Sequence, residues 1–486
     1  MFITQNEFLI DTQKTREILA NTDLTPRQRE YLESFIIRYN QKTKTSKKLA
    51  QANRSYLSDN KTFANFHLPL KEIYYPIVTK HSAGCKIWDV DGNEYIDLVM
   101  GFGVNLFGHN PPFIKEALAA QLEKGIQLGS QPEIVGEVAQ LICELTGMER
   151  VTFSNTGTEA IMTAIRVARA VTGRKKIVIF SNSYHGHFDG TLGKAKIIDE
   201  RLQAVPIEAG ILPNFVADII VLKYGEQRSL EEISIRTQEI AAVLVEPVQK
   251  ENLELQPQAF LQQLRKVTKE SGIALIFDEM VTGFRIHPGG AQAWFGIEAD
   301  IATYGKIVGG GIAIGIIAGK ANFMDAIDGG TWNYGDLSSP HQNTTFFAGT
   351  YCKHPLALAA AKAVLEQLKD CGSTLQNELN QRTTKFVETL NTYFEQEELP
   401  IQLANFGSIF GPVYLEDSSD EYTNNSDDYE TSLVFDLLYY HLLEKGIMLR
   451  GNGGFLSTAH TDEDINYIIS ALKNSISQLR EGEFLV

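Results

Sequence analysis

Between residues 151 and 319 the chain alternates short apolar runs with longer amphipathic segments. The apolar runs have the length of buried strands, and the longer segments repeat apolar residues at helical spacing. Strands that alternate with helices predict a mostly parallel sheet with helices on both faces, and therefore an α/β protein. The predicted strands are VTFS, KIVIF, DIIVLKY, AAVLVEPV, IALIFDE, DIATYGK and AIGIIAG.

The segments on either side of this region show different patterns. Two alternating apolar runs around Asp91-Gly92 predict a hairpin. Near the N-terminus, residues 24–57 predict a helix with Thr25 as N-cap and Pro26 at its first position. Long helices followed by short strands after Pro355 predict a smaller α+β domain. We expect a helical N-terminal arm (1–60), a segment contributing to the small domain (61–105), a large domain (106–354) and a C-terminal small domain (355–486).

Charge and composition exclude several function classes. The net charge of −16 argues against a nucleic-acid-binding surface, which needs clustered positive charge. We find neither a signal peptide nor an apolar run long enough to span a bilayer, and the four cysteines are widely spaced. These features predict a cytoplasmic protein without membrane contact. One basic stretch, residues 38–61, is either a solvated helix face or an arm that docks on an acidic partner.

Two residues carry the candidate chemistry. Asp278 ends one predicted strand and Lys306 follows another, so both should lie at the edge of the sheet where open α/β sheets bind ligands. A lysine that forms a Schiff base and a carboxylate that pairs with a pyridine nitrogen are what pyridoxal phosphate chemistry requires. Taken singly, each residue is more often a solvated loop lysine or a turn aspartate.

Further polar residues follow the neighbouring strands. Thr156, Gly157 and Thr158 stand at a predicted helix N-terminus, where free N–H groups and the helix dipole favour a phosphate; a plain helix cap is the alternative. Tyr184 or His185 could stack on a flat ring, whereas His185 and His187 could instead be metal ligands. Their surroundings hold no carboxylate-rich or cysteine pattern, so we expect no metal site.

Five ordered motifs together resemble one family. They are TGTEA (156–160), YHGH (184–187), EPV (246–248), DEMVTGFR (278–285) and Lys306 before GGG (309–311). The chain from about Tyr75 onward resembles class III pyridoxal-phosphate aminotransferases of fold type I. DEMVTGFR and STAHT resemble glutamate-1-semialdehyde aminomutase most closely. The whole chain also resembles aminotransferase domains embedded in hybrid polyketide and nonribosomal-peptide synthases of microcystin or iturin type.

The resemblance implies a role for each site residue. Lys306 is the Schiff-base lysine and proton shuttle, Asp278 binds the pyridine nitrogen, and Met280 and Tyr184 pack on the two ring faces. The implied catalytic residues are Lys306, Asp278 and Tyr184. The implied cofactor is pyridoxal 5'-phosphate, with pyridoxamine 5'-phosphate as its intermediate form. A homodimer is also implied, in which Thr350 completes the partner's phosphate site. The implied cofactor-binding residues are Thr156, Gly157, Thr158, Tyr184, His185, Glu246, Asp278, Met280, Lys306 and Thr350.

The substrate side departs from the aminomutase pattern. Phe102 matches a cavity-lining position, but Asn452 stands where the aminomutase has a glutamate. Lys250 and Glu251 replace a Gly-Asn pair, and Arg450 offers a cation for an acidic donor. The resemblance implies an aminotransferase that takes its amino group from glutamate or glutamine and gives it to a keto acceptor. With the departures above, we expect this acceptor to be a β-keto acyl thioester on an acyl carrier protein domain.

Three alternatives remain open at this point. The first is a glutamate-1-semialdehyde 2,1-aminomutase, an isomerase of tetrapyrrole biosynthesis on the same fold. The second is a metal hydrolase that uses His185 and His187. The third is a catalytically silent docking module, against which the intact pair of Asp278 and Lys306 argues.

Overall fold

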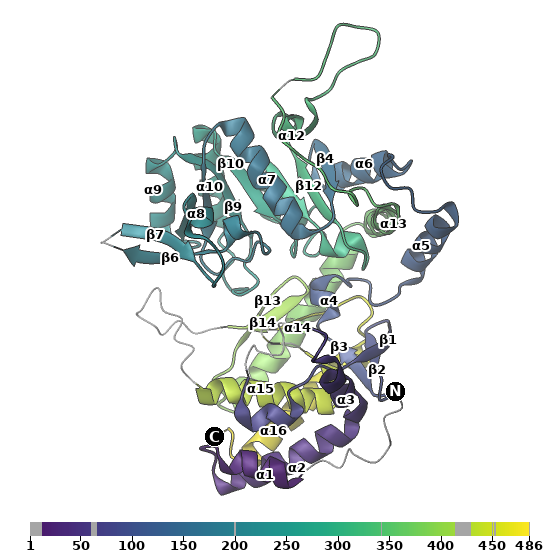
Figure 1. Cartoon of the computed structure of the whole chain (residues 1–486), viewed down its shortest axis with the longest axis vertical. Coiled ribbons are helices and arrows are strands. Elements are labelled where there is room, and N and C mark those ends of the chain that lie inside the picture. The colour runs from purple at the N-terminus through teal and green to yellow at the C-terminus, as the bar shows by residue number, and fades with distance from the viewer. Residues whose placement is uncertain are drawn as a thin grey trace.

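The chain forms two lobes (Figure 1). The computed structural model describes residues 12–59, 66–198, 201–341, 343–413, 429–449, 451 and 453–485. The upper lobe in Figure 1 is built on a seven-stranded sheet, and the lower lobe on smaller sheets and long helices. The short segment α4 (Met100–Gly103) lies at the junction of the lobes.

The large sheet has the strand order β4-β12-β11-β10-β9-β5-β8. Neighbours from β11 to β8 pair in parallel, whereas β12 runs antiparallel to both β11 and β4. The strands are β4 (Arg150–Ser154), β5 (Lys176–Phe180), β8 (Ile219–Leu222), β9 (Ile240–Val245), β10 (Ala274–Asp278), β11 (Ile301–Tyr304) and β12 (Gly315–Gly319). Each lies within or overlaps a predicted strand, so the predicted mostly parallel sheet is confirmed.

The central strands are buried on both faces. In β10, Ala274 and Ile276 belong to one core, and Leu275 and Phe277 belong to the other. Successive side chains of a strand point to opposite faces, so an unbroken apolar run serves two cores at once. The helix α7 (Gly157–Thr172) covers the first face, and α6 (Val135–Thr146), α9 (Gln227–Ile235), α10 (Gln258–Ser271) and α13 (Pro355–Cys371) pack on the second.

The lower lobe combines chain segments from both ends of the sequence. The predicted hairpin at Asp91-Gly92 is present, and its second strand pairs in parallel with β15. The strands are β1 (Thr79–Ala83), β2 (Lys86–Asp89), β3 (Glu94–Asp97) and β15 (Ile447–Met448) in one sheet, and β13 (Leu403–Phe406), β14 (Ile409–Pro412) and β16 (Gly454–Phe455) in another. The helices are α14 (Thr374–Gln396), α15 (Tyr429–Glu444) and α16 (Asp462–Glu481).

The N-terminal arm is helical, but it is not the single helix that the sequence predicts. Helix α2 (Pro26–Lys42) begins at the predicted N-cap Thr25 and ends at Thr43, where α3 (Lys44–Asn53) starts; α1 (Thr12–Ala20) precedes both. The Asp91 carboxylate accepts hydrogen bonds from the N–H groups of Thr45 and Ser46, at 2.8 Å and 3.1 Å for its nearest contacts. Free N–H groups at a helix start are stabilised by such a carboxylate, so a residue distant in sequence fixes the break.

The basic side chains of the arm bind the chain's own surface. Arg38 forms an ion pair of 3.0 Å with Glu444, and Lys47 forms one of 2.8 Å with Glu72. Lys42 donates to the carbonyl of Glu444. These contacts favour the solvated or self-packed interpretation of the basic stretch over a docking arm.

The remaining elements are short or lie at the periphery. A two-stranded ribbon of β6 (Gly193–Ile198) and β7 (Arg201–Pro206) was not predicted from the sequence. The other helices are α5 (Pro112–Lys124), α8 (Pro213–Val216), α11 (Gly290–Phe295) and α12 (Ala321–Asp328), with 3-10 turns at Leu68–Ile73, Asp189–Thr191 and Lys306–Gly309. Within the described ranges, no helix is both long and apolar enough to cross a membrane.

Candidate active site

The candidate site lies where parallel strands of the large sheet end. Asp278 is the last residue of β10, and Glu246 directly follows β9. Lys306 comes two residues after β11, and the loop of Tyr184 and His185 follows β5. Because β5, β9, β10 and β11 are parallel neighbours, their carboxyl ends lie along one edge of the sheet.

Asp278 is buried and held in one orientation. Its Oδ2 lies 2.8 Å from His185 Nδ1, and its Oδ1 accepts a 3.1 Å hydrogen bond from the N–H of Met280. The His185 ring is also buried, and its Nε2 has no hydrogen-bond partner within the described residues. His185 therefore positions the Asp278 carboxylate, a contact that the sequence did not predict.

Glu246 is a second buried carboxylate in the same cluster. It accepts a 3.0 Å hydrogen bond from the N–H of Tyr184 and so ties the β5 loop to β9. Burial raises the pKa of Glu246 to about 7, a shift that the nearby Asp278 charge reinforces and the His185 charge opposes. Above that pH, Glu246 adds a second negative charge beside Asp278. The Tyr184 side chain itself is 66% exposed.

Lys306 has the backbone and the electrostatics of a functional residue. Its φ is +47°, in the left-handed region that costs a residue with a Cβ about 1–2 kcal/mol. Burial lowers the pKa of its amine, while the charges of Asp278 and Glu246 raise that pKa and those of Arg285 and Lys250 lower it further. A lower pKa increases the fraction of neutral, nucleophilic amine at physiological pH. Strain of this kind persists where the surroundings impose it, often in active sites.

The N-terminus of α7 faces the same edge of the sheet. Thr156 is its N-cap, and its Oγ1 accepts a 3.2 Å hydrogen bond from the N–H of Glu159. A Cβ on Gly157 would lie 2.9 Å from the sulfur of Met280, so the helix start and the Met280 thioether are closely packed. The first N–H groups of a helix of this length are suited to an anion such as phosphate.

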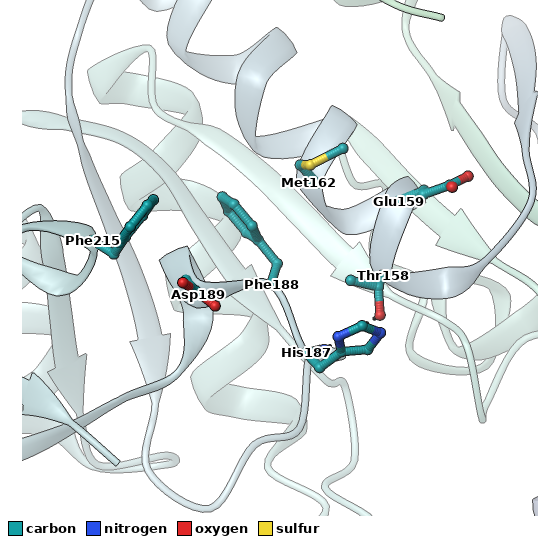
Figure 2. A pocket seen from close by; sticks show the side chains of 7 residues that line it. All are labelled: Thr158, Glu159, Met162, His187, Phe188, Asp189 and Phe215. Atoms are coloured by element: carbon teal, nitrogen blue, oxygen red, sulfur yellow. Dashed lines mark hydrogen bonds between the residues drawn. The ribbon is translucent and has the colours of Figure 1, made fainter. Parts of the chain in front are cut away.

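Thr158 joins this helix start to the histidine loop. Its Oγ1 accepts a 3.3 Å hydrogen bond from the N–H of His187. Figure 2 shows both residues at one end of a pocket of about 330 Å³. The pocket is lined by Thr158, Glu159, Met162, His187, Phe188, Asp189 and Phe215. His187 thus lies beside the helix start. Within the described residues, no group of three or more His, Cys, Asp and Glu side chains could hold a metal ion.

The structure describes some of the predicted substrate residues but not all of them. Phe102 is 50% exposed and has a φ of +57°. Glu251 lies 3.4 Å from Lys250 Nζ in the loop after β9. Thr350 is exposed in the single chain, and its neighbour Gly349 packs against Asn155 and Cys352 of the same chain. Arg450 and Asn452 lie outside the described residues.

Two residues near the site carried no predicted role. Gln249 is buried, and its Nε2 donates 2.7 Å hydrogen bonds to the carbonyl of Ser181 and to Ser183 Oγ, which fixes the loop before Tyr184. Arg285, inside the DEMVTGFR motif, is also fully buried. The sequence carries no sign of the contacts that either residue makes, because both bind groups on other segments of the chain.

The comparison with protein families decides the identification. The family described as "Aminotransferase class-III" matches residues 70–475, a range that contains all of the strand ends described above. The chain belongs to the class-III aminotransferase family. It is accordingly a pyridoxal-phosphate-dependent enzyme of fold type I, as the sequence motifs predict.

Relatives and solved structures agree with this assignment. The chain is 35% identical to the glutamate-1-semialdehyde 2,1-aminomutase of Chloroflexus aggregans over 83% of this chain and 91% of the relative. It is also 35% identical to that of Archaeoglobus fulgidus, over 83% and 93% of the two chains. An omega-transaminase from Sphaerobacter thermophilus superimposes with a TM-score of 0.77 at 26% identity, covering 90% of this chain and 98% of that one. A β-phenylalanine aminotransferase from Variovorax paradoxus gives a TM-score of 0.76 at 28% identity, with coverages of 93% and 98%.

These relatives correct the emphasis of the sequence analysis. They are aminomutases, so they favour the isomerase alternative over the predicted link to polyketide and nonribosomal-peptide synthases.

The residues of this class-III enzyme fit the cofactor. The buried carboxylate of Asp278 suits a protonated ring nitrogen, and Lys306 suits an aldehyde. Gly157 leaves no Cβ beside Met280, and the start of α7 suits a phosphate. His185 Nε2 remains a buried polar atom without a partner in the described part of the chain.

Glu246 gives the cofactor-free enzyme a specific pH dependence. Folding raises the pKa of the Glu246 carboxyl group from 4.5 to about 7. The resulting stabilisation of the fold is fully present below pH 4.5 and is lost as the pH rises through about 7. Between about pH 6 and about pH 8.5, wild type should lose about 1 kcal/mol of unfolding free energy that Glu246→Gln keeps. Urea unfolding at both pH values measures this difference. Equal pH dependence of the two proteins would contradict the raised pKa.

Proposed function

We propose that this class-III enzyme isomerises glutamate 1-semialdehyde by moving its amino group between adjacent carbons, as its aminomutase relatives are named to do. The observation that carries the proposal is the 35% identity to these aminomutases over 83% of the chain. The cluster of Asp278, His185, Glu246 and Lys306 supplies the groups that such a reaction needs.

Each residue of the cluster has a distinct task in the proposed reaction. Pyridoxal phosphate supplies an electron sink for a carbanion at the substrate carbon. Lys306 Nζ would take up and return the proton at the substrate carbon that bears the nitrogen, which its lowered pKa favours. The Asp278 carboxylate keeps a protonated ring nitrogen charged, and its bond to His185 fixes its orientation. The first N–H groups of α7 would hold the cofactor's phosphate.

A second candidate is transfer of the amino group from glutamate or glutamine to a separate keto acceptor, including a β-keto acyl thioester on a carrier protein. Two sequence departures favour it. Asn452 replaces a glutamate of the aminomutase pattern, and the ion pair of Lys250 and Glu251 replaces a Gly-Asn pair. The chain thus lacks the carboxylate at position 452 and has a different one at Glu251. This exchange would change which substrate charges the site tolerates.

Substrate turnover separates the two candidates. The purified enzyme is given glutamate 1-semialdehyde alone, and in parallel glutamate with a carrier-bound β-keto acyl chain, with products read by mass spectrometry. The proposal expects 5-aminolevulinate from the first reaction without consumption of a separate amino donor. Amination of the thioester with no isomerisation would favour the second candidate.

We also propose a homodimer in which Thr350 completes the phosphate site of the partner subunit. Thr350 lies exposed in the single chain, between α12 and α13. Thr350→Ala should weaken cofactor retention by about tenfold, because one hydrogen bond to a charged phosphate contributes about 1.5–3 kcal/mol. Dialysis followed by absorbance measures retention, with the exposed Thr389→Ala on α14 as a matched control. An active monomer in sedimentation would contradict the shared site.

A further inference from the structure

Arg285 is a buried cation without a carboxylate. Its side chain is fully buried, and within the described residues no Asp or Glu lies within ion-pair distance of it. Its Nε has no hydrogen-bond partner there either. Burying a charge without a counter-charge is unfavourable, so such a residue is kept where it performs a task.

The guanidinium joins three segments of the lower lobe. Nη1 donates a 2.8 Å hydrogen bond to Ser408 Oγ, and Nη2 donates to the carbonyl of Gly103. The centre of the guanidinium lies 5.0 Å from the centroid of the Phe455 ring. Arg285 itself follows the large-sheet strand β10, so one side chain connects the two lobes beside the active site.

The segments that Arg285 holds are strained and tightly fitted. Met100, Gly101, Phe102 and Gly103 all have positive φ, from 46° to 87°. A Cβ on Gly103 would lie 2.7 Å from the Phe455 ring, so the turn and strand β16 fit closely. A turn with two non-glycine residues in the left-handed region needs external support, and the Arg285 hydrogen bond to Gly103 provides it.

We propose that Arg285 is a positioning residue that fixes the Phe102 turn and strand β16 (Gly454–Phe455) against the site of Lys306. The inference rests on the proposed function, because the substrate of that reaction has to fit beside Phe102, which the family resemblance places on the substrate side. The guanidinium orders both segments before substrate arrives, which reduces the entropy cost of binding. Its charge also lowers the pKa of the Lys306 amine. Arg285 therefore influences both substrate fit and the proton-carrying group.

Hydrogen exchange and spectroscopy of the full-length holoenzyme test this role. In Arg285→Gln, amides of residues 98–104 and 453–457 should exchange about tenfold faster, while those of β9 stay unchanged. The visible absorbance of the lysine-bound cofactor should titrate at higher pH, because a positive charge near Lys306 has been removed. KM should rise more than kcat falls, and Arg285→Lys should recover the titration but only part of the exchange protection.

A second arginine, Arg382, provides the matched control for Arg285. Arg382→Gln removes a different arginine, one that binds the carbonyl of His460, and should leave residues 98–104 and the titration unchanged. Unchanged exchange in both segments of folded Arg285→Gln, or an unshifted titration, would overturn the proposal. If Arg285→Gln does not fold, hydrogen exchange of Arg285→Lys at residues 98–104 is the test. Exchange as slow as in wild type would then overturn the proposal. Hydrogen exchange and the absorbance titration are measured without substrate. If the isomerase proposal fails, the wild-type enzyme will not isomerise glutamate 1-semialdehyde, and these two measurements are unaffected.

Discussion

Replacement of Lys306 by alanine should nearly abolish turnover, with a fall in kcat toward the upper end of about 10²–10⁴-fold, because the variant has no group to carry the proton. The same variant should lose the visible absorbance of lysine-bound cofactor, since no other amine takes the place of Lys306 Nζ. It should still fold, because alanine removes a buried amine and leaves the strands intact. Steady-state kinetics and an absorbance spectrum measure both effects.

The matched control is Lys266→Ala, an exposed lysine on α10. It should keep wild-type turnover and absorbance. If Lys306→Ala keeps more than about one per cent of wild-type kcat, the loss is no larger than that caused by removing a single hydrogen bond. Such a result would contradict the assigned role of Lys306.

Asp278→Asn should lower kcat by about 10²–10³-fold, the usual cost of losing one preorganised charged group at a reacting centre. Asparagine preserves the shape and still meets His185, but it carries no charge to keep the ring nitrogen protonated. Lys306 is unchanged, so the variant should still bind the cofactor covalently. This combination of retained absorbance and lost turnover separates an electronic role for Asp278 from a structural one.

Asp218→Asn provides the comparison for this variant. Asp218 precedes β8, at the opposite edge of the same sheet, and its side chain is 49% exposed. Its replacement should change kcat less than twofold. If Asp278→Asn retains more than about a tenth of wild-type kcat, the carboxylate is not the partner of the ring nitrogen.

The sequence predicts the large sheet well because its strands are buried on both faces. Runs such as IAAVLV in β9 are wholly buried, so no polar residue interrupts their pattern. The strand ends then place Asp278 and Lys306 on one edge by topology alone. The N-cap Thr156 is equally local, since its hydrogen bond spans three residues.

Other features depend on residues that are distant in sequence. The break between α2 and α3 is fixed by Asp91, about 45 residues downstream, so helical periodicity gives no sign of it. Arg285 contacts Gly103 and Ser408, more than 120 residues away on either side. The bond of His185 to Asp278 likewise joins the loop after β5 to the end of β10, so nothing in the sequence indicates that His185 contacts this carboxylate.

We infer that Lys306, beside Asp278, is the residue that binds the cofactor covalently. Borohydride reduction of the purified holoenzyme fixes the cofactor to its lysine, and peptide mass spectrometry then locates the pyridoxyl group. The account predicts a single modified peptide that contains Lys306. A pyridoxyl group on Lys250, Lys320 or any other lysine, with Lys306 unmodified, would contradict it.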